Sequence, residues 1–176
     1  QDITLSFYAT LSSHDYLTNE SILQALSGTQ FGSQQSNPAE ILLLVRESVL
    51  KAPSDAVKLA RMVKRCNAWG LPVWTWFIYE HSNGYYPSWE DAGHLKTFKT
   101  LFDTWVAKHS LDIEGILFDN EWDQEIFDFD GNLLKYADKI LSHRKTTQQN
   151  WTETIKVYEE VASEWTDSAV ATESMP

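Results

Sequence analysis

The chain has 176 residues, of which 43% are hydrophobic and 22% charged, and this is the composition of a globular domain rather than a disordered segment. Its net charge of −11 argues against binding to nucleic acid or to an anionic membrane surface, because both ligands need a basic footprint on the protein. No apolar run reaches the roughly 18 residues that a transmembrane helix needs, so we expect no membrane contact.

Five short apolar segments predict β-strands. The second of them, Ile41–Val45, is an unbroken apolar run, which is typical of a strand buried on both faces. The third is rich in aromatic residues, and because side chains alternate along a strand, Trp74 and Trp76 should share one face while Thr75 and Phe77 share the other. The predicted strands are 3–9, 41–45, 73–79, 113–118 and a segment that begins near 168.

Helical patterns separate these strands. After a short helix at 21–26, a longer one should open at Pro53-Ser54-Asp55, with Ser54 as a good N-cap, and should end at Trp69-Gly70, where glycine terminates it. Apolar residues at a spacing of 3.6 predict an amphipathic helix at about 90–109. Further helical signal covers 133–143 and 151–165.

Strands that alternate with single helices predict an α/β fold with a parallel sheet. We expect a single and partial domain over 1–176, namely about the first five strands of a (β/α)8 barrel of the TIM type, which usually needs about 250 residues. An open doubly wound sheet is the alternative, although no glycine-rich phosphate loop follows the first strand. Because a free sheet edge favours aggregation, the remainder of the barrel or a partner chain should cover it.

Two carboxylates follow the fourth strand. Asp119 and Glu121 are two residues apart, so in an extended strand they share a face at its carboxyl end, where barrels carry their active sites. Such a pair is unfavourable at the end of an apolar strand unless it faces a pocket or binds partners. The pair therefore indicates acid catalysis or ligand contact, and a structural role in capping the next loop or binding a basic side chain is the alternative.

The run from Glu114 to Glu121, Glu-Gly-Ile-Leu-Phe-Asp-Asn-Glu, resembles the strand-4 signature Asp-Gly-x-Asp-x-Asp-x-Glu of chitinase-like family-18 glycoside hydrolases. The match falls on Gly115, Asp119 and Glu121. The resemblance implies that Glu121 donates the proton to the glycosidic oxygen, and that Asp119 orients the N-acetyl group of the substrate, which acts as the nucleophile. The mechanism would be substrate-assisted, an exception to the usual scheme of two carboxylates.

The run departs from the signature at two positions. Glu114 replaces the first Asp, a mild change, whereas Leu117 replaces the second Asp, which in the family forms a carboxylate stack with the assisting Asp. Other barrel hydrolases use a strand-4 Glu as acid/base and a nucleophilic carboxylate from a later strand. The later candidate within this chain is Glu173, on the predicted fifth strand. The alternative is a non-catalytic glycan-binding or structural protein on the same scaffold, and Leu117 is its support.

Aromatic residues near the end of the third strand favour a carbohydrate ligand, since flat amphipathic rings suit stacking on sugars. Aromatic residues in a loop are better evidence of binding than those in a core, although they can also pack a loop onto the barrel rim. The predicted glycan-contacting residues are Tyr79, Glu80, Tyr86, Trp89, Trp122 and Trp76.

No cofactor or metal is expected. The five histidines lack ligand spacing, and the oxygen-rich segment 119–132 does not have the spacing of an EF-hand calcium loop. The single cysteine, Cys66, lies in a helical apolar pattern and should be a buried thiol. Two glycosylation motifs start at Asn19 and Asn150, and together with Gln1 as first residue they favour a secreted glycoprotein.

Overall fold

The computed structural model describes residues 6–28, 39–78, 92–118, 134–135, 137–138, 141–142, 155–164 and 171–174. The strands are β1 (Ser6–Ala9), β2 (Glu40–Arg46), β3 (Val73–Ile78), β4 (Gly115–Phe118) and β5 (Ala171–Ser174). The named helices are η1 (Leu11–Ser13), α1 (His14–Leu17), α2 (Glu20–Ser27), α3 (Glu47–Lys51), α4 (Pro53–Ala68) and α5 (Ala92–His109). Residues 155–164 are also helical, as are the short pieces between 134 and 142.

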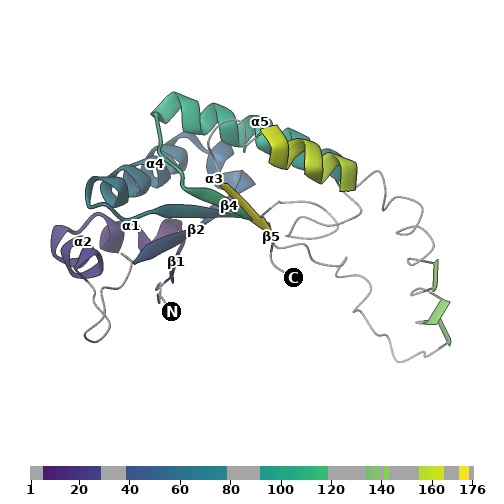
Figure 1. Ribbon diagram of the computed structural model, residues 1–176, viewed down its shortest axis with the longest axis horizontal. Helices are drawn as coiled ribbons and strands as arrows, with labels where there is room; N and C mark the ends of the chain where they lie inside the picture. The colour runs from purple at the N-terminus through teal and green to yellow at the C-terminus, as the bar shows by residue number, and fades with distance from the viewer. Residues whose placement is uncertain are drawn as a thin grey trace.

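The strands form a parallel sheet in the order β1-β2-β3-β4-β5, so each strand pairs with the one before it in the chain. The predicted α/β fold with alternating strands and helices is confirmed. The order never reverses, whereas a doubly wound sheet has a reversal point. Because crossovers between parallel strands are right-handed, an unreversed order places the helices on one face of the sheet. Figure 1 shows α2, α4, α5 and the 155–164 helix on the same side.

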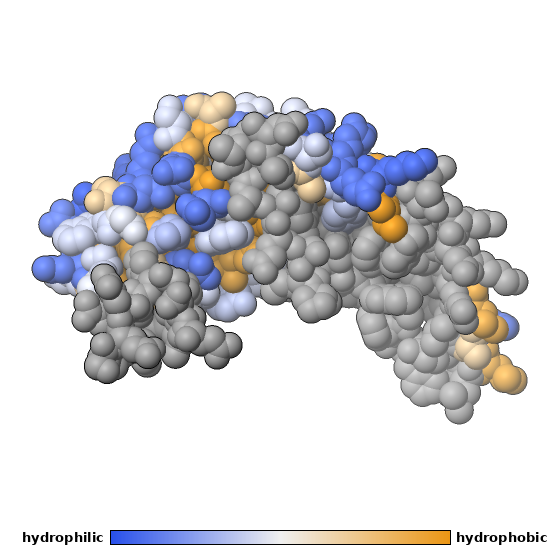
Figure 2. Space-filling model, in the orientation of Figure 1, coloured by the Kyte–Doolittle hydropathy of each residue, from blue (hydrophilic) through white to orange (hydrophobic). Residues whose placement is uncertain are grey.

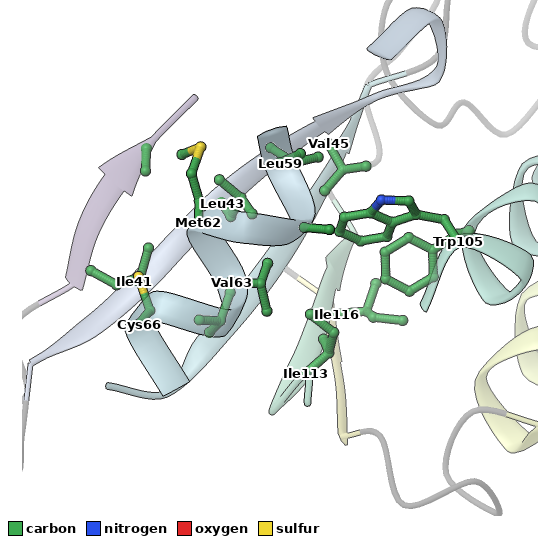
Figure 3. Close-up of a cluster of buried hydrophobic side chains, with 14 of the residues drawn as sticks. Ile41, Leu43, Val45, Leu59, Met62, Val63, Cys66, Trp105, Ile113 and Ile116 are labelled. Carbon is green, nitrogen blue, oxygen red and sulfur yellow. The ribbon is translucent and has the colours of Figure 1, made fainter. Parts of the chain in front are cut away.

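The hydrophobic core lies between the sheet and these helices. Every second residue of β2 faces the helices, and Ile41, Leu43 and Val45 are each at most 1% exposed. Their partners in β3 alternate in the same way, so that Thr75 and Phe77 are fully buried on this face. In Figure 3 these β2 side chains point at Leu59, Met62, Val63 and Cys66 of α4. The predicted division of the third strand into two faces is therefore confirmed.

Helix α4 packs through positions at helical spacing, which are Ala56, Leu59, Ala60, Met62, Val63 and Cys66. Cys66 is buried, which confirms the expected buried thiol, and burial raises the pKa of this thiol to about 12. The helix opens at Pro53, within the predicted Pro53-Ser54-Asp55 segment, but the predicted N-cap Ser54 is wrong: Ala52 occupies the N-cap, without a side-chain bond. Proline fits the first turn because its missing N–H would have no partner there. The helix ends at Ala68, with Trp69 as its C-cap, and Gly70 follows in the left-handed conformation with φ 68°, as expected of a terminating glycine.

Helix α5 covers the other half of this sheet face and falls within the predicted range of 90–109. Its Phe98 and Phe102 pack on Phe77 of β3, with ring centroids 4.5 Å and 4.9 Å apart. The indole N–H of Trp105 donates a 2.9 Å hydrogen bond to the carbonyl oxygen of Ala56, which joins α5 to α4. One buried polar atom is thereby satisfied within an otherwise apolar contact.

Ion pairs connect α5 to the 155–164 helix. Lys99 Nζ lies 2.9 Å from Glu164 and 2.5 Å from Asp103, and Lys96 Nζ lies 2.6 Å from Glu160. Partial burial lowers the pKa of Lys99, but the hydrogen bonds to Asp103 and Glu164 outweigh it, so the net pKa is raised. The amine therefore stays charged where it bridges the two helices.

The predicted fourth and fifth strands are present with shifted bounds. Strand β4 starts at Gly115 rather than Ile113, although the N–H of Glu114 already bonds to the carbonyl of Val73 at 2.9 Å. The described part of the fifth strand, Ala171–Ser174, pairs in parallel with β4.

Hydrophilic residues line the outer edge of the helix layer in Figure 2. Among the described residues, no helix is both long and apolar enough to cross a membrane.

Candidate functional site

The carboxyl-terminal edge of the sheet is the edge at which parallel α/β proteins bind their ligands. Arg46 ends β2 and pairs with Ile78, the last described residue of β3. Strand β4 ends beside them at Phe118. The chain leaves all three strands at this edge, and the side chains just before and after these ends are the candidates for function.

Most of the residues predicted from the sequence lie outside the described residues. These are the carboxylates Asp119 and Glu121, the glycan-contacting candidates Tyr79, Glu80, Tyr86, Trp89 and Trp122, and the glycosylation candidate Asn150. The backbone of Glu173 is described, in β5 opposite Leu117. Of the predicted glycan-contacting residues, Trp76 is the one whose surroundings the structure gives.

Trp76 lies on the face of the sheet that points away from the helices. It is partly exposed, and Tyr8 of β1 meets it edge-on, with ring centroids 6.1 Å apart and planes at 75°. The Tyr8 side chain is 68% exposed. Aromatic side chains from two strands therefore contribute to a face on which a flat ligand could stack.

Leu117 lies on this same face. It pairs in register with Trp76, whereas its neighbour Ile116 is fully buried in the helix-side core. Leu117 itself is 8% exposed and, like Leu42 and Ile78, it is buried without belonging to that core. The position at which the sequence signature has an acid is thus apolar and enclosed, and it faces away from the helices.

Next to the end of β2 lies a buried carboxylate that the sequence interpretation missed. The Glu47 side chain is 3% exposed, and its two oxygens are held by two different basic side chains: Oε1 lies 2.5 Å from Lys51 Nζ, and Oε2 lies 3.0 Å from His94 Nε2. Lys51 is in the last turn of α3, and His94 is in the first turn of α5. The cluster therefore connects the segments that follow β2 and β3 at the carboxyl-terminal edge.

Two opposing effects set the pKa of Glu47. Burial raises it, but hydrogen bonds from Lys51 and His94, together with their charges, outweigh burial, so the pKa is lowered from its ordinary value of 4.5. Burying an unpaired carboxylate would be strongly unfavourable, whereas this one is ionised and has both oxygens bonded. The cluster is thus a stable fixed charge near the strand ends.

Replacing Glu47 by Gln is expected to lower the free energy of unfolding at pH 7 by about 1–3 kcal/mol, because charge-assisted hydrogen bonds are lost. Since the folded pKa is lowered, the carboxylate stabilises the protein fully above the ordinary value of 4.5 and loses this effect as the pH falls through the folded pKa. Urea unfolding at pH 7, 5 and 3.5 should show the difference shrinking with acidity.

The matched control is Asp55→Asn, which weakens an exposed pair in which Lys58 Nζ lies 3.8 Å from the carboxylate. It should change the unfolding free energy by no more than about 0.5 kcal/mol. A Glu47→Gln protein whose deficit is the same at all three pH values would contradict the assigned role of the charged carboxylate.

The sequence did contain a signal for this cluster. The apolar run of β2 ends abruptly in Arg46-Glu47, just as that of the fourth strand ends in Asp119. In both strands, a charge at the end of a buried segment indicates that the charge faces a pocket or binds a partner. The pairing of His94 with Glu47 connects residues 47 positions apart, which no local pattern reveals.

One cleft among the described residues lies at the opposite edge of the sheet, where strands β3 and β4 begin. It has a volume of about 180 Å³, which is below the roughly 300 Å³ at which ligand pockets usually start. Its lining is mostly polar and consists of Asn67, Gly70, Leu71, Pro72, Val73, Asp112 and Glu114. In barrel-like folds this edge contributes to stability rather than catalysis.

The glycosylation candidate Asn19 has a structural task as well. Its side-chain oxygen accepts a 3.0 Å hydrogen bond from the backbone N–H of Ser21, which caps the start of α2. A glycan would be attached to the side-chain nitrogen of this exposed residue, so the capping oxygen and the modification do not compete. The two roles can be separated by substitution.

Replacing Asn19 by Ala is expected to lower the free energy of unfolding by about 1 kcal/mol, because the N-cap bond of α2 is lost. Asn19→Asp keeps a capping oxygen but destroys the glycosylation motif, so unglycosylated protein with this change should match the wild type in urea unfolding. Intact mass after expression in eukaryotic cells then reports on the glycan alone. Equal stability of the Ala and Asp variants would contradict the capping role.

Comparison of the chain with protein-family models, with curated proteins and with solved structures gives no match. Arguments about function therefore rest on the chain's own residues. Among the described residues, no group of three or more His, Cys, Asp and Glu side chains is arranged to hold a metal ion.

Proposed function

We propose that this chain forms part of a (β/α) barrel that hydrolyses glycosidic bonds, with Glu121 as the proton donor and Asp119 as its assisting carboxylate. The observation that carries the proposal is the orientation of β4: Leu117 faces away from the helices, beside Trp76. If the extended conformation continues beyond Phe118, the side chains two and four residues further along, Asp119 and Glu121, share that face. Both would then lie at the edge where barrels bind substrates.

The unreversed strand order supports the barrel. A sheet that winds in one direction, with its helices on one face, is the arrangement of successive strands in a (β/α)8 barrel. Strands β1 and β5 end the sheet, and Phe7 and Tyr8 of β1 are exposed. We infer that the remainder of a barrel or a partner chain pairs with these edges, because free edges of this kind favour aggregation.

In the proposed reaction the Glu121 carboxylic acid gives its proton to the glycosidic oxygen as the bond to the sugar carbon breaks. The carbonyl oxygen of the substrate's N-acetyl group bonds to that carbon, and Asp119 stabilises the positive charge on the resulting ring. Water then opens the ring and returns a proton to the Glu121 carboxylate. A general acid of this kind needs a raised pKa, for which a nearby carboxylate and apolar neighbours are suitable causes.

The aromatic face supports a sugar ligand. Trp76 and Tyr8 present ring surface on the side of the sheet away from the helices. The proposed binding residues that follow β3 and β4 in the sequence are Tyr79, Glu80, Tyr86, Trp89 and Trp122. Rings of this type contribute large apolar contact area while their polar atoms remain available for hydrogen bonds.

A glycan-binding protein without catalytic activity is the second candidate, and the burial of Leu117 favours it. Where the resembling family has a carboxylate stacked on the assisting Asp, this chain has an enclosed leucine. Removing that carboxylate changes the electrostatic environment of Asp119. Barrels can keep a binding groove while losing activity, since fold does not fix function.

Turnover and binding measured side by side distinguish the two candidates. The full chain is incubated with N-acetylchitohexaose and with a panel of other neutral and acidic oligosaccharides between pH 4 and pH 7. Release of new reducing ends is followed by chromatography, and binding by calorimetry. Cleavage supports the hydrolase, binding without cleavage in any preparation supports the binding protein, and the absence of both would overturn the two proposals together.

A further inference from the structure

Arg46 has an unusual position in the fold. It is the only Lys or Arg on the described strands, and it ends β2 at the carboxyl-terminal edge. Side chains alternate along β2, and Ile41, Leu43 and Val45 are buried against the helices. Arg46 therefore shares the opposite face with Leu42 and Leu44. Its side chain is exposed. Arg46 therefore lies on the face that points away from the helices, at the edge where parallel α/β proteins bind ligands.

Among the residues that the structure describes, the charges next to Arg46 do not neutralise it. The adjacent carboxylate, Glu47, faces the other way and already has both oxygens engaged by Lys51 and His94. Among the described residues Arg46 has no salt-bridge partner and makes no capping bond to α3. Two permanent cations, Arg46 and Lys51, thus accompany one anion at the end of β2, in a chain whose net charge is −11.

The guanidinium group of Arg46 limits the chemical class of ligand that it can bind. A guanidinium group presents a planar fork of donors that matches a carboxylate or another oxyanion with two parallel hydrogen bonds, which an ammonium group does not do. On the same face, Trp76 stands in register with Leu44, one repeat before Arg46. An aromatic ring and a guanidinium group on one face of the sheet together offer stacking for a sugar ring and ion pairing for a charged substituent.

We propose that Arg46 binds an anionic group of the substrate, so that the glycan is an acidic one that carries carboxylate or sulfate groups. The inference rests on the proposed function and names the class of sugar. Strand β4, which leads to the proposed acid, lies two strands from β2, and at roughly 4.8 Å per strand this is about 10 Å. A short oligosaccharide spans this distance, so Arg46 would hold a unit close to the cleaved bond.

Calorimetric titration of the full chain tests the proposal. The probes are hyaluronan tetrasaccharide, which carries carboxylates, keratan sulfate tetrasaccharide, which carries sulfates, and neutral N-acetylchitotetraose. All three contain the N-acetyl group that the proposed reaction needs. The variants are Arg46→Gln, Arg46→Lys and the control Arg61→Gln, which removes the same charge from the exposed outer side of α4. Thermal unfolding of each variant verifies that the fold is intact, which we expect because both arginines are exposed.

The wild type should bind an anionic probe more tightly than the neutral one. Arg46→Gln should weaken that binding by roughly 10–100-fold, the effect of losing a charge-assisted hydrogen bond, and Arg46→Lys should recover only part of it. Arg61→Gln should leave it unchanged. Whichever anionic probe loses more affinity in Arg46→Gln identifies the group that Arg46 recognises.

Two outcomes would overturn the inference in different ways. If glycans bind but Arg46→Gln behaves like Arg61→Gln, Arg46 does not recognise the substrate, and the proposed hydrolase stands without it. If no probe binds and no glycan is cleaved, the proposed function itself fails and takes this inference with it.

Discussion

Replacing Glu121 by Gln is expected to reduce glycan hydrolysis by about 10²–10⁴-fold, the usual contribution of a positioned general acid. Gln has nearly the shape of Glu but cannot donate the proton that the leaving oxygen needs. The loss should appear in kcat, whereas binding of the intact oligosaccharide should change little, because the proton transfer takes place only in the transition state.

The control for this variant is Glu159→Gln, which makes the same chemical change at an exposed position of the 155–164 helix. It should retain wild-type turnover. Asp119→Asn should reduce kcat as well, and it should do so most for substrates with an N-acetyl group. Unchanged turnover in Glu121→Gln would remove Glu121 from the mechanism, and equal losses in the two Glu→Gln variants would indicate a general effect of charge.

Replacing Phe77 by Ala is expected to lower the free energy of unfolding by about 3–5 kcal/mol, the usual range for removing a fully buried phenylalanine. Phe77 is 0% exposed, and its side chain projects from β3 onto the rings of Phe98 and Phe102 in α5. Truncation leaves a cavity at the centre of the contact between the sheet and α5. The free energy of unfolding of a protein domain is only about 5–15 kcal/mol, so this substitution would remove a large part of it.

The matched substitution is Phe7→Ala in β1, where the side chain is 38% exposed. It removes the same atoms without opening a buried cavity, so its effect should be no more than about 1 kcal/mol. Urea unfolding followed by tryptophan fluorescence measures both variants. Similar effects of the two substitutions would contradict the assignment of Phe77 to the core.

The local patterns of the sequence predicted most of the fold. The apolar run of β2, the aromatic alternation of β3 and the helical spacing of α5 each correspond to an element with the expected buried face, because hydrophobic periodicity directly reflects which face is buried. The short helix α3 was missed, since its five residues are too few to show a period. The N-cap of α4 was predicted wrongly because proline, and not serine, sets the start of the helix.

The candidate site was less predictable. The separation of Trp76 from Thr75 and Phe77 was predicted because strand alternation is regular, and Leu117 was recognised as a departure because a motif has fixed spacing. The contact between Glu47 and His94 depends on how α3 and α5 meet, and sequence spacing carries no information about that. Arg46 becomes notable only once its neighbours are known to be engaged elsewhere.

The strand order has a consequence for how the chain reaches its native state. Each strand forms its ladder with the strand that precedes it in the chain, so during synthesis every new unit meets a partner that has already left the ribosome. Folding can therefore advance from the amino terminus towards the carboxyl terminus. Until the following unit is synthesised, the edge of the newest strand has unpaired N–H and C=O groups that can pair with other chains. Pauses in translation after β2 or β3 should therefore increase binding of chaperones to the nascent chain.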